Sequence, residues 1–257
     1  MKKTFMLLMA MVMVVMMVAG CGGGEKKKAE APKVLRVGTE PTFAPFEFQK
    51  DGSKEFDGFD MDLIRAIGKQ LNMKVEILNM GFDALIPALN AGNIDVAAAG
   101  MSITPDRQKA VDMSDPYYVA GLVVVVNKDN TAVKGINELN NKGIAVQIGT
   151  TGAERAAKVP GAKVKNFNTN AEVFLELKNK GVEAVIIDKP VAEYFLATGG
   201  GKDYAKIVGD TMEAESYGLS LKKNSPLTKD INKALLDLKK NGEYDKIYAK
   251  WFGAVKK

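Results

Sequence analysis

The sequence contains no histidine and only one cysteine, Cys21, among its 257 residues. The chain therefore has no imidazole base, and a single thiol can form neither an intramolecular disulfide nor a Cys-His nucleophile pair. A structural zinc site built from cysteine and histidine is excluded for the same reason. Only a metal site made of carboxylates stays open, and we expect neither a metal nor a cofactor.

The chain also lacks a strong charge imbalance in its folded part. Its formal net charge is +5, but from residue 33 onward 31 basic residues face 29 acidic ones. Because nucleic-acid binding depends on clustered positive charge, we expect no nucleic-acid partner. With 46% hydrophobic and 26% charged residues, the composition is that of a soluble globular protein. The length allows one large domain or two of about 100 to 130 residues.

The longest apolar run lies near the N-terminus, from Phe5 to Val18, shortly after Lys2 and Lys3. It has 14 residues, too few for a comfortable membrane span of about 20. A basic start, a short apolar run and small residues at its end are typical of an export signal. We therefore expect residues 1–20 to be a signal peptide.

Cys21 follows the small residues Ala19 and Gly20, an arrangement that resembles the lipobox of bacterial lipoproteins. In such proteins the cysteine becomes the lipid-modified first residue of the mature chain. Residues 21–32 have no apolar periodicity and are typical of a flexible tether. We expect a protein anchored to the cell membrane by a lipid on its extracytoplasmic side, at the cell surface or in the periplasm. A plain secretory leader followed by a stray cysteine is the alternative.

From Val34 onward, short β-branched runs alternate with amphipathic stretches, the pattern of βαβ units and parallel sheets. Strand and helix segments fall into two successive sets, so two sheets are expected rather than one. The predicted strands are 34–37, 74–78, 94–99, 121–126, 143–148, 163–167, 184–187 and 217–221. The predicted helices are 60–71, 82–89, 104–109, one from 151, and 171–180, 191–197, 226–240 and 243–252.

Ligands of open parallel sheets gather at the carboxyl ends of the strands, so the residues that follow each apolar run are candidate site residues. They form a small set with charged, hydroxyl, amide and aromatic side chains and glycines. Its members are Thr39, Glu40, Phe43, Phe82, Gly100, Ser102, Thr104, Arg107, Gln147, Gly149, Thr150, Thr151 and Asp188.

Arg107 lies in the first turn of a predicted helix, where the helix dipole favours anions over cations. A cation in that position indicates a bound anion, and a guanidinium suits a carboxylate bidentately. Free N–H groups near Ser102 and at the start of the helix at Thr151 would complete a carboxylate site. The alternative is a surface arginine paired with Asp106 or Asp112.

Asp188 directly follows the apolar run 184–187 and precedes Lys189 and Pro190. This position places its carboxylate at the end of a strand and the start of a helix, where it could also serve as an N-cap. Phe43 and Phe82 could flank a ligand or simply belong to the core.

Five segments in order resemble the polar amino-acid-binding proteins of bacterial ABC importers (substrate-binding protein family 3), which include glutamine-, arginine-, lysine- and histidine-binding proteins. The resemblance covers about residues 33–253. It is carried by Val37-Gly38-Thr39-Glu40-Pro41-Thr42-Phe43-Ala44-Pro45-Phe46-Glu47-Phe48, Asp57-Gly58-Phe59-Asp60-Met61-Asp62-Leu63, Ala99-Gly100-Met101-Ser102-Ile103-Thr104 with Arg107, Gly149-Thr150-Thr151-Gly152, and Tyr248-Ala249-Lys250-Trp251-Phe252-Gly253.

The resemblance implies an α/β fold of the type II periplasmic binding protein kind, in which two lobes joined by two crossing strands close on a ligand. The first lobe would be 33–117 with 218–257 and the second 121–213, joined by a hinge at 118–120 and 214–217.

The resemblance also implies the ligand contacts. Arg107, with backbone N–H groups at Ser102 and Thr151, would bind the α-carboxylate. Asp188, Ser102 and the Gly100 carbonyl would hold the α-ammonium, and Glu40, Phe43, Phe82, Gln147 and Gly149 would surround the side chain.

Glu40 and Gln147 depart from the glutamine-binding pattern, which has aspartate at the first position and lysine at the second. Without that lysine Glu40 has no evident basic partner, and a buried carboxylate is costly unless a cation pairs with it. We therefore favour arginine or lysine as the ligand. Glutamine is the alternative, because the Gln147 amide can both donate and accept.

The expected partners are the amino acid ligand and the membrane permease of an ABC transporter, with the protein itself a monomer. Two alternatives of other classes remain, because fold alone does not fix function. One is a dehydratase on the same scaffold, although no isolated acid-base pair is evident and we expect no enzyme. The other is the sensor lobe of a receptor.

Overall fold

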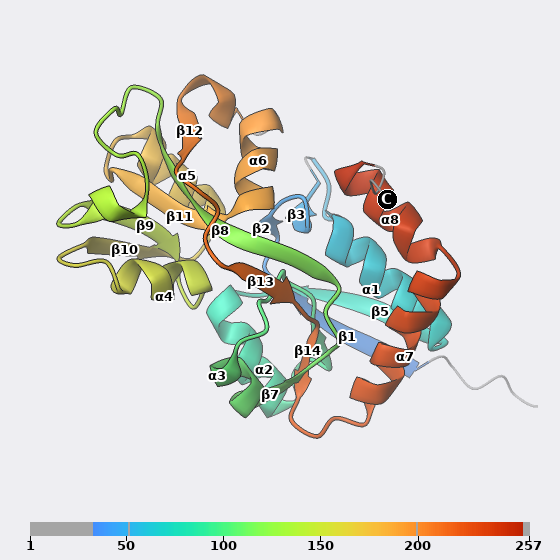
Figure 1. Ribbon diagram of the computed structural model, residues 1–257. Helices are drawn as coiled ribbons and strands as arrows, with labels where there is room; N and C mark the ends of the chain where they lie inside the picture. The colour runs from blue at the N-terminus through green and yellow to red at the C-terminus, as the bar shows by residue number, and fades with distance from the viewer. Residues whose placement is uncertain (1–32, 51, 199, 254–257) are drawn as a thin grey trace, which may run out of the picture. The chain divides into compact units, whose positions relative to one another are not determined.

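Two β-sheets, each with helices packed on it, form the core of the protein in the computed structural model (Figure 1). The structure describes residues 33–253, except residues 51 and 199. The predicted signal peptide, the tether and Cys21 lie outside the described residues. We call the first sheet with its helices the first lobe, and the second sheet with its helices the second lobe.

The first sheet has the strand order β5-β1-β6-β14-β7. β1 runs parallel to β5 and β6, whereas β14 is antiparallel to β6 and β7. The apolar residues of the first strand and helix meet inside this lobe, where Leu35, Leu63, Ile64 and Ile67 are fully buried. The strands are β1 (Lys33–Thr39), β5 (Met73–Asn79), β6 (Val96–Ala97), β7 (Val111–Met113) and β14 (Ser220–Lys222).

The second sheet has the order β10-β9-β11-β8-β12. Its parallel part, β10-β9-β11, meets the long strand β8 in an antiparallel pairing. The run 121–126 of β8 is buried along its whole length, as its unbroken apolar sequence predicts. The strands are β8 (Tyr118–Asn127), β9 (Gly143–Gln147), β10 (Lys163–Phe167), β11 (Ala184–Asp188) and β12 (Ala205–Val208).

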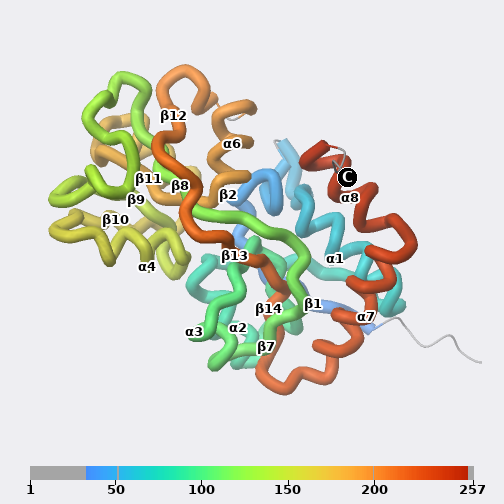
Figure 2. The backbone as a smooth tube through the Cα atoms, in the orientation of Figure 1, coloured from blue at the N-terminus to red at the C-terminus, as the bar shows by residue number. Residues whose placement is uncertain are grey.

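Two neighbouring segments carry the chain between the sheets. In Figure 2 the tube passes through β8 into the second lobe and returns through β13 (Ala214–Tyr217) to β14. β13 pairs with the first residues of β8 in an antiparallel register, from Ala214 opposite Gly121 to Tyr217 opposite Tyr118. The expectation of two crossing strands agrees with this pairing.

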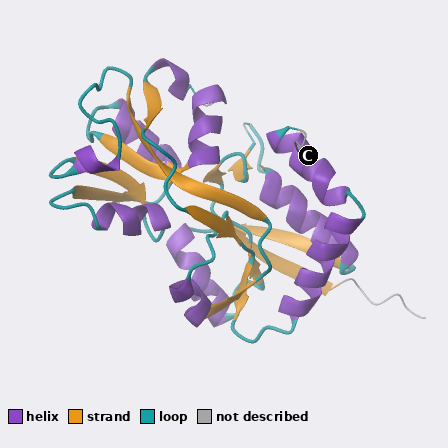
Figure 3. Cartoon of the chain, in the orientation of Figure 1, coloured by secondary structure: helices purple, strands orange, loops and turns teal. Residues whose placement is uncertain are grey.

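The helices lie against the sheets, as Figure 3 shows. The first lobe also carries a small antiparallel sheet, β2 (Thr42–Phe43), β3 (Glu47–Gln49) and β4 (Phe56–Asp57), which the sequence analysis did not predict. The helices are α1 (Phe59–Gln70), α2 (Leu85–Ala91), α3 (Pro105–Ala110), α4 (Thr151–Ala157), α5 (Asn170–Lys178), α6 (Lys189–Thr198), α7 (Leu227–Lys240) and α8 (Glu243–Phe252).

Three predicted elements differ from the structure. The run 94–99 forms only the short strand β6, because β14 covers just two of its residues. The predicted strand 217–221 is interrupted at Gly218 and Leu219, where the chain passes from β13 to β14. The predicted helix 226–240 begins one residue later, at Leu227, whose backbone N–H donates to the Ser225 hydroxyl at 3.3 Å.

No helix within the described part of the chain is long and apolar enough to span a membrane.

The start of α5 provides a test of local stability. Thr169 accepts a hydrogen bond from the backbone N–H of Glu172, whose carboxylate accepts from the backbone N–H of Thr169 at 3.0 Å, a reciprocal capping box. Thr169→Ala removes the cap, so we expect the free energy of unfolding to fall by about 1 kcal/mol in urea titrations. Glu172→Gln, which keeps an acceptor at the same place, should cost less; an equal loss from both variants would contradict the capping role.

Candidate functional site

A small pocket, with a free volume of about 20 Å³, lies where the two lobes meet. Nine of the ten residues predicted to contact a ligand line it, and the tenth, Gly149, is bonded to one of them. The lining residues are Glu40, Phe43, Glu47, Phe82, Ala99, Gly100, Ser102, Arg107, Gln147, Thr150, Thr151 and Asp188.

The strand ends explain why residues far apart in sequence converge here. Glu40 follows β1, Gly100 lies shortly after β6, Gln147 ends β9 and Asp188 ends β11. In both sheets the carboxyl ends of the parallel strands therefore face the same pocket, as expected for open α/β sheets.

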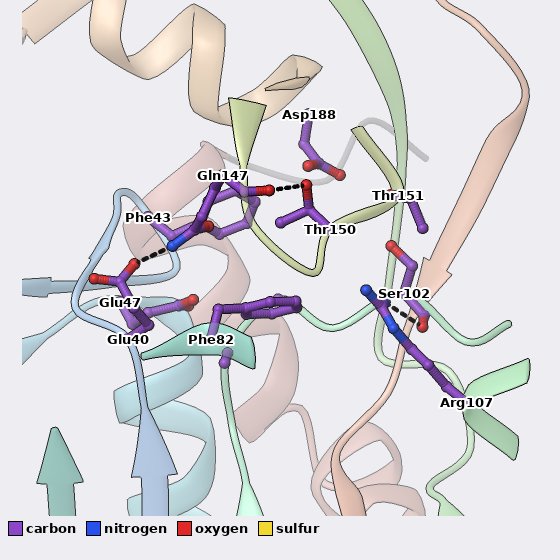
Figure 4. Close-up of a pocket in the computed structure, with 12 residues that line it drawn as sticks. Glu40, Phe43, Glu47, Phe82, Ser102, Arg107, Gln147, Thr150, Thr151 and Asp188 are labelled. Carbon is purple, nitrogen blue, oxygen red and sulfur yellow. Dashed lines mark hydrogen bonds between the residues drawn. The ribbon is translucent and has the colours of Figure 1, made fainter. Parts of the chain in front are cut away.

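The pocket has two distinct ends. Figure 4 shows Glu40 and Glu47 at one end, Arg107 with Ser102 at the other, and the Phe82 ring between them. The carboxyl groups of Glu40 and Glu47 thus lie opposite the Arg107 guanidinium.

Arg107 forms the cationic end. Its guanidinium donates from Nη1 to the Ser102 carbonyl at 2.8 Å and from Nη2 to the Gly149 carbonyl at 2.9 Å, and it lies 5.4 Å from the centre of the Phe82 ring. Only 8% of the residue is exposed, and this burial lowers the pKa of the guanidinium.

Arg107 has no carboxylate within 4.0 Å among the described residues. The two acids that might have paired with it bind lysines instead, Asp106 with Lys109 and Asp112 with Lys223. A buried guanidinium held by two carbonyls retains N–H groups and a charge for an external anion. The reading of Arg107 as a surface ion-pair partner is therefore wrong.

Ser102 and Thr151 lie beside this end, one from each lobe. Both hydroxyls donate to the same carboxylate oxygen, Oε2 of Glu215 in β13, at 2.6 and 2.7 Å. The Thr151 position is fixed by Thr150, which precedes α4 and accepts from the Ala153 N–H. Glu215 is not among the site residues predicted from the sequence.

Asp188 is 7% exposed and accepts a hydrogen bond from the Tyr217 hydroxyl at 2.5 Å. The pKa of Asp188 is raised to about 7, mainly by burial and also by the charge of Glu215, which together outweigh the lowering by the Tyr217 hydrogen bond and by Arg107. The Asp188 carboxylate therefore faces the pocket as an acid near its titration point.

Glu40 lies at the other end of the pocket. Its Oε2 accepts from the Thr42 hydroxyl at 2.7 Å and from the Gln147 amide at 2.8 Å. Gln147 also donates to the Asn168 carbonyl and accepts from the Asn170 amide, so most of its hydrogen-bonding capacity is used by the protein. Gln147 thus orients Glu40.

Glu47, which the sequence analysis did not select, lines the same end. It is 1% exposed, its Oε2 has no hydrogen-bond partner, and no base within the described residues forms an ion pair with it. Burial, and then the nearby charges of Asp60, Glu40 and Asp188, raise its pKa well above the usual range. This end of the pocket therefore holds two buried carboxyl groups.

Gly100 closes the floor of the pocket in a left-handed conformation with φ +52°. A β-carbon there would lie 2.5 Å from an edge carbon of the Phe43 ring, so only glycine fits. The Gly100 N–H donates to Asp60 at 2.9 Å, and the same carboxylate oxygen accepts from Tyr117 at 2.6 Å. Asp60 holds this turn in place from below.

Phe43 and Phe82 are each 8% exposed and line the pocket while also packing in the hydrophobic core. The two roles predicted for these phenylalanines, packing in the core and contacting a ligand, therefore do not exclude one another.

Asp60 should make stability depend on pH. Burial raises its pKa to about 7, so between pH 6 and 8 the folded state loses a proton that the unfolded state has already lost. We expect the free energy of unfolding to fall over that interval, and Asp60→Asn to remove about 1.4 kcal/mol of the fall. Urea titrations at pH 6 and 8 measure this. Asp210→Asn, in an exposed loop, is the control; an unchanged pH dependence in Asp60→Asn would refute the assignment.

Comparisons with known proteins agree with this geometry. The family described as "Bacterial extracellular solute-binding proteins, family 3" matches residues 35–254. The probable histidine-binding protein of Neisseria gonorrhoeae is 34% identical, over 88% of this chain and 87% of its own. The arginine-binding extracellular protein ArtP of Bacillus subtilis (strain 168) is 33% identical, over 87% and 88%.

Among solved structures, an ancestral arginine-binding protein bound to arginine is 47% identical, with a TM-score of 0.83, and covers 87% of this chain and 100% of its own. The family match spans both lobes and the crossing segments. The chain therefore belongs to the bacterial extracellular solute-binding proteins of family 3, the two-lobed amino-acid-binding proteins of ABC importers.

Proposed function

We propose that this protein binds a basic amino acid, arginine or lysine, between its lobes and presents it to the permease of an ABC importer. The observation that carries the proposal is the pair of buried carboxyl groups, Glu40 and Glu47, at the end of the pocket opposite Arg107. Carboxyl groups without a basic partner are costly to bury, and a cationic side chain would offset that cost.

The Arg107 end of the pocket has partners for the α-carboxylate and the α-ammonium groups of the ligand. Arg107 would take the α-carboxylate, with the N–H groups of Ser102 and Thr151, and Asp188, Ser102 and the Gly100 carbonyl would take the α-ammonium. Phe43, Phe82 and Gly149 would enclose the aliphatic part of the side chain. A zwitterion with a cationic tip thus meets a partner of opposite sign at each of its three charges.

Glutamine is a weaker candidate, because the Gln147 amide that would bind it already bonds to Glu40, Asn168 and Asn170. The arginine- and histidine-binding names of the relatives favour a basic ligand. Those relatives also bear the names of binding proteins, which supports our inference that the chain is not an enzyme.

The lobes are proposed to be residues 33–117 with 218–257 and residues 121–213, joined at 118–120 and 214–217. Ligand groups from both lobes surround the pocket, so a bound amino acid would stabilise the closed arrangement by contacts that exist only there. We propose that the protein acts as a monomer, held outside the cytoplasm by a lipid on Cys21.

A ligand screen tests this function. A ligand at 100 times its dissociation constant stabilises the folded state by about 2.7 kcal/mol, so thermal unfolding should shift clearly with arginine or lysine. Histidine and glutamine should shift it less. The absence of a shift with every common amino acid would remove the proposed function.

Glu40→Gln and Glu47→Gln should each weaken arginine binding by about 2 kcal/mol in calorimetry, because each removes a buried partner of the ligand cation. Glutamine affinity should change much less in the same variants. Glu55→Gln, on the exposed surface, is the matched control. Unchanged arginine and lysine affinities in both pocket variants would exclude this end of the pocket as the cation site.

Binding should also release a proton from Asp188. Its pKa is about 7 in the free protein and should fall when an ammonium group pairs with it. Because protons then compete with the ligand, affinity should rise with pH up to about 7 and level off above it. Calorimetry at pH 6 in buffers of different ionisation enthalpy counts the protons released. Asp188→Asn should bind weakly and lose this release; a release equal to that of the wild type would point to another group.

A further inference from the structure

Glu215 lies on the strand that returns to the first lobe and connects the two halves of the pocket. In β13 it pairs with Ala120, and alternate residues of a strand point to the same face, so Glu215 and Tyr217 project together. Tyr217 donates to Asp188, and Glu215 accepts from Ser102 and Thr151. One short strand therefore contacts three residues that are proposed to hold the ligand.

The direction of these hydrogen bonds limits what the hydroxyls can offer a ligand. An ionised carboxylate only accepts, and a hydroxyl has a single hydrogen to donate. Ser102 and Thr151 both give that hydrogen to Oε2 of Glu215. Toward the pocket their oxygens can then only accept a hydrogen bond.

A hydroxyl that can only accept suits an ammonium group and is unfavourable for a carboxylate. Arg107 donates one hydrogen bond each to the Ser102 and Gly149 carbonyls. Its remaining N–H groups and backbone N–H groups are the donors left for an anion. The site is thus divided: hydroxyls for the cationic group of the ligand, guanidinium and backbone for its anionic group.

The negative charge of Glu215 also favours an ammonium group over a carboxylate. It lies close enough to Arg107 to raise the pKa of the guanidinium, and it also raises the pKa of Asp188, although it forms no ion pair with Arg107 within 4.0 Å. A negative charge behind the hydroxyls attracts an ammonium group and repels a carboxylate from that part of the pocket.

We propose that Glu215 is a positioning residue that fixes the Ser102 and Thr151 hydroxyls as acceptors and thereby makes the site select ligands with a free α-ammonium group. This inference rests on the proposed function and adds to it a determinant that itself need not touch the ligand. Glu215 acts through two hydroxyls, one from each lobe.

Glu215→Gln tests the inference, because it removes the negative charge behind the two hydroxyls and replaces one carboxylate oxygen by an NH2 group that can only donate. Calorimetry compares L-arginine with 5-guanidinopentanoic acid, which lacks the α-ammonium group. We expect the wild type to prefer arginine strongly. In Glu215→Gln arginine should weaken by at least tenfold while the analogue changes by less than threefold, so that the preference collapses.

Ser102→Ala provides a second variant, which does not depend on how Glu215→Gln folds. It should reduce the preference for arginine in the same way, and Glu215→Gln added to it should reduce the preference by less than it does in the wild type. Glu213→Gln, an exposed acid two residues from Glu215, is the control and should leave both affinities unchanged.

The measured affinities distinguish failure of the positioning role of Glu215 from failure of the proposed function. Equal weakening of both ligands in Glu215→Gln, or an unchanged preference, overturns the positioning role while arginine binding by the wild type sustains the proposed function. A wild type that binds no arginine overturns both.

Discussion

The cost of burying charge is the constraint on which the rest of this structure depends. Arg107 lies at one end of the pocket with two carbonyls as its protein partners, and Glu47 lies at the other end with an oxygen that bonds to nothing. Groups of this kind are unfavourable in an empty, dry interior. The two sheets, the turn at Gly100 and the start of α4 hold these groups in fixed positions, so an incoming zwitterion meets an electrostatic environment that is already arranged.

The crossing strands β8 and β13 join the two lobes, and β13 also contacts residues of the pocket. β13 pairs with β8 and at the same time sends Tyr217 and Glu215 to the pocket, where they meet groups from the second lobe. Ser102 of the first lobe forms a bridge with Tyr217. A displacement of one lobe relative to the other must therefore alter hydrogen bonds at the site itself, which links lobe position to ligand contacts without any intervening relay.

Much of this site could be predicted from sequence because parallel sheets place the residues after apolar runs at one edge. That rule identifies Glu40, Arg107, Gln147 and Asp188 from the sequence alone. It missed Glu47 because this acid lies between Phe46 and Phe48, in a small antiparallel sheet whose short strands leave little periodicity. It missed Glu215 because its hydrogen bond to Ser102 joins residues 113 positions apart, and no local pattern encodes such a pairing. The predicted limits of β6 and β14 were wrong for the same reason, because the partner strand determines where each strand begins and ends.

The position of β14 in the first sheet has a consequence for the order in which this chain can fold. β14 lies between β6 and β7, although residues 220–222 follow the whole of the second sheet in sequence. The second sheet is formed by one continuous stretch of chain, from β8 to β12. Its strands can therefore pair as soon as that stretch is available. The first sheet cannot be completed until β14, which lies in the last quarter of the polypeptide, is present between β6 and β7. Long sequence separation slows such pairing, so the N-terminal strands β6 and β7 lack their common partner until β14 is available.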